Sequence, residues 1–216
     1  MTLSAWLALV AVCVLGAMSP GPSLALVVRS TINRGRGAGL ITALSHGLGV
    51  GVYALATALG LAAVIATQQP LFTAITLAGA AYLLWLGASA MQATHSGAAG
   101  ASEAPAGPAG AAHGGTPGGL AAARDGLAMA LLNPKIAVFF VALFSQFVST
   151  DANGWTVAVL AGTATTVDAG WYALVAMGLS ASGGAAWLRR HRVWIERLTG
   201  AVLVFLALST AATVIR

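Results

Sequence analysis

Charge is nearly absent from this sequence. Charged residues make up 7% of its 216 residues while apolar residues make up 58%, whereas a typical soluble domain has roughly 25% charged residues. So few charges cannot cover a water-soluble surface, and the composition indicates a chain whose solvent is a lipid bilayer. The ten basic residues stand in short clusters between apolar runs. Such clusters are typical of membrane topology signals and not of a face that binds nucleic acid.

Cysteine and several catalytic motifs are also scarce or absent. The single cysteine, Cys13, excludes a disulfide framework, a cysteine-rich metal site and a dithiol that passes electrons within the chain. No GxxxxGK[ST] motif is present, which argues against ATP-driven transport. Ser45 and His46 are adjacent on a helix and point apart, so they do not form the nucleophile and base of a hydrolase. We therefore expect no enzyme, no cofactor and no resident metal.

Six apolar runs are long enough to cross the hydrocarbon core, which takes about 20 helical residues. The first run has no Lys or Arg before it and continues past two prolines, so we expect a retained membrane helix and not a cleaved signal peptide. The six predicted spans are Leu3–Val28, Gly39–Ala66, Pro70–Gln92, Ala121–Val148, Trp155–Ser182 and Val193–Ile215.

A stretch poor in large apolar side chains separates the third and fourth spans. Residues 93–120 are mainly Gly, Ala, Pro and Ser, a composition that predicts a flexible cytoplasmic linker. The linker divides the chain into two three-helix units, residues 1–92 and residues 121–216. His95 and His113 lie in the linker without Cys or acidic partners at ligand spacing, so we interpret them as solvated loop residues.

Basic residues mark alternate loops, and this predicts an orientation. They cluster after the first span, near the end of the central linker and after the fifth span, whereas the second and fourth loops have none. Because positively charged loops stay in the cytoplasm, we expect these three loops inside a bacterial plasma membrane and both termini outside. The residues concerned are Arg29, Arg34, Arg36, Arg124, Arg189, Arg190, Arg192 and Arg197.

Proline breaks occur at matching places in the first and fourth spans. The first contains Pro20, Gly21 and Pro22, and the fourth contains "LLNPKIAVFF". Each proline removes a backbone hydrogen bond that lipid cannot replace. Since three spans make one half, the second half enters the membrane with opposite polarity, which predicts an all-helical membrane protein of two inverted three-helix repeats. Breaks of this kind line a polar substrate site in transporters, although each proline is also explained by a packing kink.

Few ionisable residues lie inside the predicted spans, and each is a functional candidate because a charge within the membrane is costly. Lys135 is the only lysine, and Asp168 is the only acid deep in a span. Counted from the loop that joins the fourth and fifth spans, the two fall at comparable depth, so we hypothesise that they pair or titrate together. Asp168 would exchange a proton or hold a substrate amine, and Lys135 would tune it or hold a carboxylate. A purely structural ion pair is the alternative.

Five further residues are weaker candidates for the site. His46 and Tyr53 are seven residues apart and share one helical face, where the histidine either relays protons or packs at the inner interface. Trp171 and Tyr172 follow Asp168 and are placed to line a cavity. Gln146 is a polar residue near the outer end of the fourth span.

Small and aromatic residues within the spans are explained by packing and by the membrane interface. Gly39, Ala43, Gly47 and Gly51 recur at every fourth residue, which predicts close helix contact within or between subunits and leaves a homo-oligomer open. Other aromatic residues fall near predicted span ends, as in an interfacial belt. They are Trp6, Tyr82, Trp85, Trp155, Trp187 and Trp194.

Several segments resemble the LysE/RhtB amino-acid exporters of the lysine exporter superfamily. The similarity lies in "SPGP", "RGRGAGL", "AYLLWLGA", "LLNPKIAVFF", the "D..WY" pattern of the fifth span and "RRHRVWIERLTGAVLVFLAL". It covers nearly the whole chain outside the linker, and the combination of "PGP" with "NPK" is its most specific feature. One departure is Ser145, where the family often has proline, and this weakens the case for Gln146.

The resemblance implies export of amino acids or close derivatives from the bacterial cytoplasm, driven by a proton or ion gradient. Its motif positions here are Pro20, Gly21, Pro22, Asn133, Pro134 and Lys135, with Asp168 from the fifth span. The expected mechanism is alternating access around a midplane site, and the scarcity of charge favours small neutral substrates. The alternative is a divalent metal exporter of the same superfamily, for which one Asp, one His and one distant Cys are few ligands.

Overall fold

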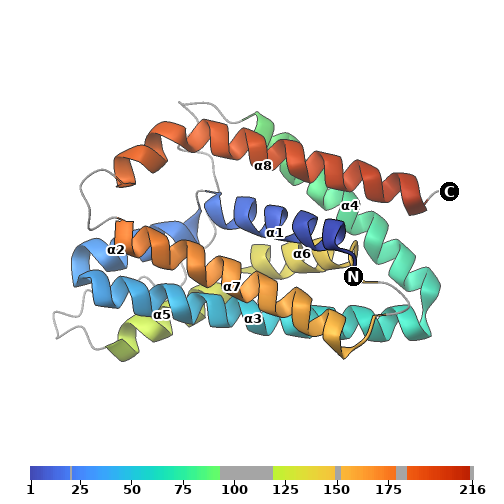
Figure 1. The fold of residues 1–216 in the computed structure, drawn as a ribbon, viewed down its shortest axis with the longest axis horizontal. Helices are drawn as coiled ribbons and strands as arrows, with labels where there is room; N and C mark the ends of the chain where they lie inside the picture. Colours follow the sequence, from blue (N-terminus) through green and yellow to red (C-terminus); the bar gives the residue numbers. More distant parts are fainter. Residues whose placement is uncertain (20, 93–118, 149–151, 179–183, 215–216) are drawn as a thin grey trace.

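The computed structural model describes residues 1–19, 21–92, 119–148, 152–178 and 184–214, and these residues form helices joined by short connections without strands. The helices lie lengthwise in one bundle, and α1 begins at the same end of the bundle at which α8 ends (Figure 1). The prediction of an all-helical chain is therefore confirmed. The helices are α1 (Leu3–Met18), α2 (Pro22–Arg34), α3 (Arg36–Thr67), α4 (Gln69–Met91), α5 (Gly119–Leu131), α6 (Pro134–Phe144), α7 (Gly154–Gly178) and α8 (Gly184–Val214).

Two of the predicted spans are each split into two helices. The α1–α2 pair bends by 59° and the α5–α6 pair bends by 55°. α2 begins at Pro22 and α6 begins at Pro134, the first helical position, where the N–H that proline lacks has no helical partner. The breaks expected from the two proline motifs are therefore present.

The described residues contain three to five candidate membrane spans by length and hydropathy. α3, α4 and residues Val193–Val214 of α8 qualify alone, and each bent pair qualifies when it is taken as one span. α7, the counterpart of the predicted fifth span, does not qualify, because its glycines, its threonines and Asp168 lower its hydropathy. The count of six spans and the inverted symmetry of the two halves stay predictions.

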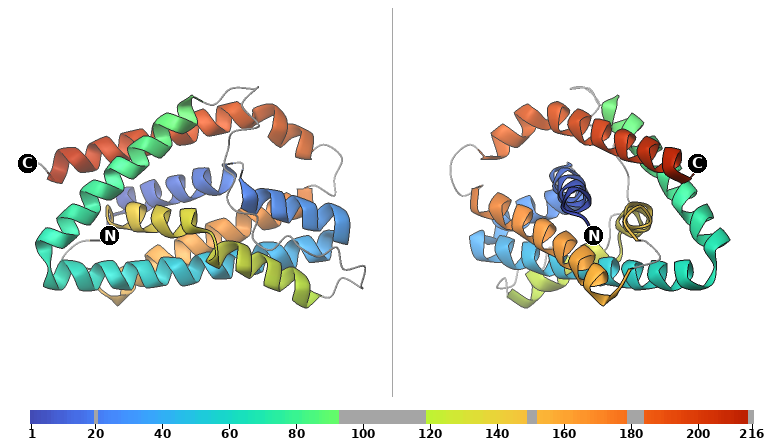
Figure 2. Two further views of the ribbon diagram at one scale, coloured as in Figure 1. Left: turned by 180° about the vertical axis from the view of Figure 1, so that it is seen from behind. Right: turned by 45° about the vertical axis from the view of Figure 1, so that its right-hand side comes forward.

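The packing pairs helices that hold corresponding places in the two halves of the chain. α3 packs along α7, and α4 packs along α8. Figure 2 shows α1 and α6, one helix of each bent pair, between these two layers. α1 contacts α7 and α8, while α6 contacts α3 and α4. One helix beside each break thereby packs on both layers.

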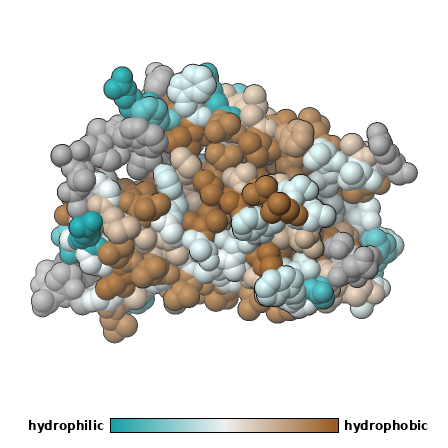
Figure 3. All heavy atoms as spheres, viewed as in Figure 1, coloured by the Kyte–Doolittle hydropathy of each residue, from teal (hydrophilic) through white to brown (hydrophobic). Residues whose placement is uncertain are grey.

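α3 shows how the helices divide between the interior and the outside. Its large apolar side chains lie exposed on one face at spacings of three and four residues, while its small residues are buried on the opposite face. Apolar residues also cover much of the surface in Figure 3. Such an outer surface suits contact with hydrocarbon and not with water. The exposed residues of α3 are Ile41, Leu44, Leu48, Val52, Leu55 and Leu59.

The glycines of α3 allow neighbouring helices to approach closely. A Cβ atom built on Gly47 would lie 2.6 Å from the Cβ atom of Ala169 in α7, and one on Gly51 would lie 2.5 Å from the Thr165 hydroxyl oxygen. A Cβ atom on Gly39 would collide with the side chain of Thr31 in α2. The predicted packing role of these glycines is confirmed, and the contacts lie within one chain.

The helices around the basic segments are longer than predicted. The first basic loop reduces to Gly35, since α2 runs to Arg34 and α3 begins at Arg36. Gly35 turns the chain with a φ of 87°, which glycine adopts readily. The segment "RRHR" was expected in a loop, but it lies within α8. Arginine is a good helix former, so a polar segment that leaves the hydrocarbon does not by itself end a helix.

Some predicted features lie outside the described residues. Pro20 is one of them, and so is the linker from residue 93 to residue 118, with His95 and His113. The first two residues of α5, Gly119 and Leu120, are helical although the linker was predicted to run to residue 120.

The first testable prediction concerns the contact of α3 with α7. We expect Gly47→Val to lower the free energy of unfolding by about 1–3 kcal/mol or more, because the added side chain must push two helix backbones apart. Gly60→Val on the same helix is the matched control, since nothing lies within 4 Å of a Cβ atom at Gly60. Thermal unfolding of the purified protein in detergent measures both variants, and equal losses would contradict the close contact.

Candidate functional site

Three polar side chains from three helices meet beside the α1–α2 break. The Nδ1 atom of His46 in α3 lies 2.7 Å from Oδ2 of Asp168 in α7. Its Nε2 atom lies 2.9 Å from the hydroxyl oxygen of Ser23 in the first turn of α2. We call Ser23, His46 and Asp168 the histidine cluster. His46 is almost fully buried, and Asp168 keeps 14% of its side chain exposed.

Close helix packing holds the histidine cluster together. Gly47 follows His46 and packs against Ala169, which follows Asp168, so the contact that needs glycine brings the two ionisable side chains within hydrogen-bond reach. The buried ring of Tyr172, one turn after Asp168, meets the imidazole edge to face with centroids 5.1 Å apart. With both ring nitrogens bonded and one ring edge covered, the imidazole orientation is fixed.

The histidine cluster is arranged to change its hydrogen bonds when it takes up a proton. An ionised carboxylate only accepts hydrogen bonds, so Nδ1 of His46 donates to Asp168 while the cluster holds no extra proton. Nε2 of the neutral ring then accepts a hydrogen bond from the Ser23 hydroxyl. When the ring is protonated both nitrogens donate, and Ser23 must turn from donor to acceptor. One proton thus reverses the bond that links α3 to α2.

The second break is bonded to the same helix α3. In an unbroken helix the carbonyl of Leu131 would accept from the N–H of Lys135, but that N–H donates to Oδ1 of Asn133 at 3.0 Å. The hydroxyl of Tyr53 replaces it and donates to the Leu131 carbonyl at 2.6 Å. His46 and Tyr53, predicted to share one face of their helix, therefore each reach one of the two breaks.

The two proline motifs act on the backbone beside these side chains. Gly21 is the N-cap of α2, its carbonyl accepts from the N–H of Ala25 at 3.0 Å, and Pro22 starts the helix that presents Ser23. Asn133 is the side-chain cap of α6, and Pro134 starts that helix. Each motif thus ends one helix and starts the next at a place where a polar side chain of α3 forms a hydrogen bond.

Lys135 and Asp168 are not brought together. Lys135 is exposed near the start of α6, and the part of the chain that the structure describes contains no ion pair between it and Asp168, which pairs with His46 instead. The hypothesis that the two residues pair was based on their depth along the helices, which can be counted in the sequence. The sequence does not show where each helix lies around the bundle. In the structure α6 packs on α3 and α4, whereas α7 packs on α1 and α3.

Gln146 and Trp171 stand apart from the histidine cluster. Gln146 lies in the turn after α6, and its side-chain oxygen accepts a hydrogen bond from the Thr210 hydroxyl of α8. Trp171 packs with the apolar group formed by α2, α3 and α7. Each has a buried side-chain nitrogen without a hydrogen-bond partner among the residues described. Neither side chain is bonded to His46 in that part of the chain.

Ser23 is the member of the site that the sequence analysis missed. Ser23 directly follows the PGP motif and lies in the first turn of the helix that starts there. That position beside the break was the feature of the sequence that could have identified it. The described residues contain no group of three or more His, Cys, Asp or Glu side chains placed to hold a metal ion.

Comparison with known proteins agrees with this arrangement of two broken helices. A family model described as "LysE type translocator" matches residues 14–213, which include both breaks and the whole histidine cluster. The chain belongs to the LysE family of translocators. The resemblance seen in the sequence motifs is therefore confirmed, and the chain is a multi-pass membrane protein of this family.

Individual relatives of this LysE translocator are 28% to 31% identical to it in the matched regions. It is 31% identical to a leucine efflux protein of Klebsiella pneumoniae over 134 residues, which are 62% of this chain and 58% of that protein. It is 31% identical to a leucine efflux protein of an Enterobacter species over 150 residues, 67% of this chain and 64% of the relative. An uncharacterized membrane protein of Vibrio cholerae is 28% identical over 170 residues, 78% of each chain. No solved structure matches the chain.

The second testable prediction concerns the hydrogen bond at the second break. We expect Tyr53→Phe to destabilise the protein by about 0.5–1.5 kcal/mol, since it removes the hydrogen bond to the Leu131 carbonyl. Tyr82→Phe is the matched control, because no hydrogen bond of the Tyr82 hydroxyl occurs within the described ranges. The comparison is made by thermal unfolding in detergent, and a control that loses as much stability as Tyr53→Phe would refute the role of this bond.

Proposed function

We propose that this LysE translocator is a proton-coupled secondary exporter of small neutral amino acids, with leucine as the first substrate to test. The observation that carries the proposal is the histidine cluster, a buried pair of protonatable side chains bonded to a broken helix. Family membership and the similarity to proteins named for leucine efflux support an amino acid as the substrate. The small number of charges inside the bundle favours a neutral substrate side chain.

In the proposed site, the two breaks hold the two charged ends of the amino acid. Helix N-termini carry partial positive charge and attract carboxylates. α2 begins at the first break and α6 at the second, and Lys135, which is exposed near the start of α6, adds a positive charge at the second break. Asp168, which lies beside the first break, attracts the ammonium group. Gly21, Pro22, Asn133 and Pro134 shape the backbone of this site, and Pro20 belongs to the first of the two proline motifs.

Proton coupling in this proposal follows from competition at Asp168. The ionised carboxylate attracts the substrate ammonium, and 14% of the Asp168 side chain remains exposed. Uptake of a proton by the pair of Asp168 and His46 cancels that negative charge and weakens the hold on the ammonium. A proton that enters from outside thus favours release of an amino acid that came from the cytoplasm. Alternating access of the site, between two inverted repeats with both termini outside, completes the exchange.

The third testable prediction is a loss of coupling in Asp168→Asn. We expect leucine transport driven by a pH gradient to fall by about tenfold or more in proteoliposomes, because the amide can neither release a proton nor hold a charge opposite the ammonium. Asp168→Glu keeps the carboxylate and is expected to retain part of the transport. The assay follows radiolabelled leucine, with a panel of other amino acids, in the presence and absence of the gradient.

Two outcomes of that assay would contradict the proposal. Undiminished gradient-driven transport by Asp168→Asn would exclude this residue from proton coupling. A wild-type protein that moves none of the amino acids but moves a divalent metal ion with the gradient would favour the alternative of a metal exporter.

A further inference from the structure

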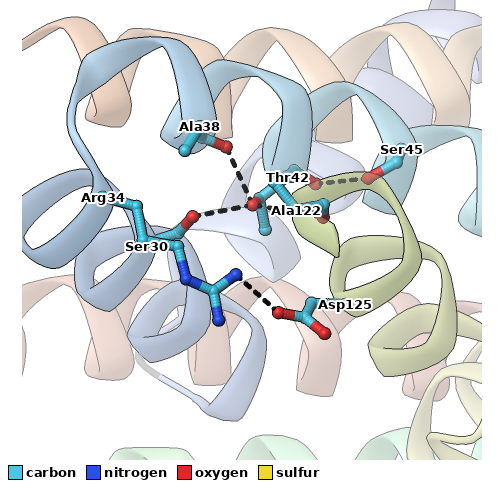
Figure 4. A network of polar contacts seen from close by, with 7 residues as sticks. All are labelled: Ser30, Arg34, Ala38, Thr42, Ser45, Ala122 and Asp125. Atoms are coloured by element: carbon cyan, nitrogen blue, oxygen red, sulfur yellow. Dashed lines mark hydrogen bonds and ion pairs between the residues drawn. The ribbon is translucent and has the colours of Figure 1, made fainter. Parts of the chain in front are cut away.

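α2 is held to its neighbours by polar side chains that share one face of the helix. Ser23, Ser30 and Arg34 are separated by seven and four residues, which places them on one side of an α-helix. Ser30 Oγ lies 2.9 Å from the Thr42 hydroxyl of α3, and Arg34 Nη1 lies 2.8 Å from Asp125 Oδ2 of α5 (Figure 4). Together with the bond from Ser23 to His46, α2 has polar partners along its whole length.

Thr42 joins three helices at the centre of this arrangement. Its hydroxyl lies 2.9 Å from the Ala38 carbonyl of its own helix and 3.3 Å from the Ala122 carbonyl of α5. Because its single hydroxyl hydrogen is directed at carbonyls, Ser30 must donate to Thr42. Thr42 is fully buried, so this contact seals the space between α2, α3 and α5. We call the Ser30–Thr42 and Arg34–Asp125 contacts the α2 latch.

Glycines flank α2 at both ends, whereas its neighbours α3 and α5 are packed tightly against each other. The chain turns at Gly21 before α2 and at Gly35 after it, and Gly35 has a positive φ. α3 and α5 are by contrast locked together, since a Cβ atom on Gly126 of α5 would collide with the carbonyl of Thr42 and the hydroxyl of Ser45. Near Gly35, Gly39 of α3 packs closely against Thr31 of α2, and α2 could rotate about this contact.

The chemistry of the latch suits repeated opening. Arg34 and Asp125 keep 38% and 29% of their side chains exposed, and ion pairs with such exposure contribute little stability. Each latch group has a hydroxyl or a charge that water satisfies once the contact opens. Between Ser23 and the latch residues, α2 also packs through the buried apolar side chains of Leu24 and Val27.

We propose that α2 is the inner gate of the transporter, closed in this structure by the α2 latch and released when the histidine cluster takes up a proton. Release of the gate by a proton rests on the proposed function, because the proton is the one that drives export. The α2 latch itself does not depend on which substrate is moved. The ionisable groups around His46 are Asp168 and Tyr172 of α7, and Cys13 of α1 lies within electrostatic range of Asp168. Those at the latch are Arg34 and Asp125.

The gate is tested first by locking it. Arg34→Cys and Asp125→Cys are combined in a protein whose only native cysteine is replaced by Cys13→Ala, and a reducible bifunctional thiol reagent joins α2 to α5. We expect leucine efflux from proteoliposomes to fall by about tenfold and to return on reduction, because a locked gate prevents access from inside. Trp6→Cys with Thr163→Cys is the matched control, since a side-chain contact of 3.1 Å joins α1 to α7 there. Cross-linking of that pair is expected to leave efflux within about twofold of the Cys13→Ala background.

Accessibility of the latch is the second measurement, and it needs no transport. The full chain in detergent, carrying Cys13→Ala and Ser30→Cys, is labelled with a maleimide. The labelling rate at position 30 is divided by the labelling rate of a Cys13→Ala protein with Ser209→Cys, because Ser209 is exposed on α8. We expect this ratio to be about fivefold higher at pH 5.5 than at pH 8 as the open state is populated. His46→Gln is expected to abolish the difference, and Arg34→Ala is expected to raise the ratio at both pH values.

The outcomes separate this inference from the proposed function. Efflux that survives complete cross-linking of the Arg34→Cys, Asp125→Cys variant, or a labelling ratio that is equal at both pH values, would overturn the gate. A Cys13→Ala protein that moves no amino acid would overturn the proposed substrate, and the labelling ratio would then decide the gate alone.

Discussion

The bond between His46 and Asp168 is the constraint on which the rest of the structure depends. A carboxylate inside a membrane protein must be paired, and its partner here is on another helix. The pairing requires α3 and α7 to approach until Gly47 meets Ala169, so the small residues of these helices serve the polar site as much as the packing. That close pair forms the layer against which the two broken helices are arranged.

The helix breaks are tolerated because α3 supplies side chains for both of them. At the first break His46 bonds the side chain of Ser23, and at the second Tyr53 bonds the carbonyl of Leu131. Lipid would leave such groups unsatisfied, so each break requires a polar side chain from a neighbouring helix. One face of one helix thereby sets the positions of α2 and of the α5–α6 junction, and the substrate site we propose lies between them.

The sequence was sufficient for features that depend on local chemistry and period. The proline motifs located both breaks, the spacing of His46 and Tyr53 placed them on one face, and Asp168 stood out as an acid within an apolar segment. What it could not supply was the position of each helix around the bundle, and so the pairing of Asp168 with His46 was not predicted. The polar face of α2 was also hidden, because Ser30 and Arg34 read as part of a basic loop.

The use of polar contacts on α2 follows from the solvent of the protein. In a bilayer, apolar side chains gain little by choosing a helix over lipid, so packing alone does not distinguish a closed arrangement from an open one. Directional bonds from Ser23, Ser30 and Arg34 do distinguish them, and each is exchanged for water at small cost when the helix moves. In the gate that we propose, a proton on His46 would reverse the first of these bonds, so the charge state of the interior would act directly on α2. Coupling would then require no further element between the proton and the gate.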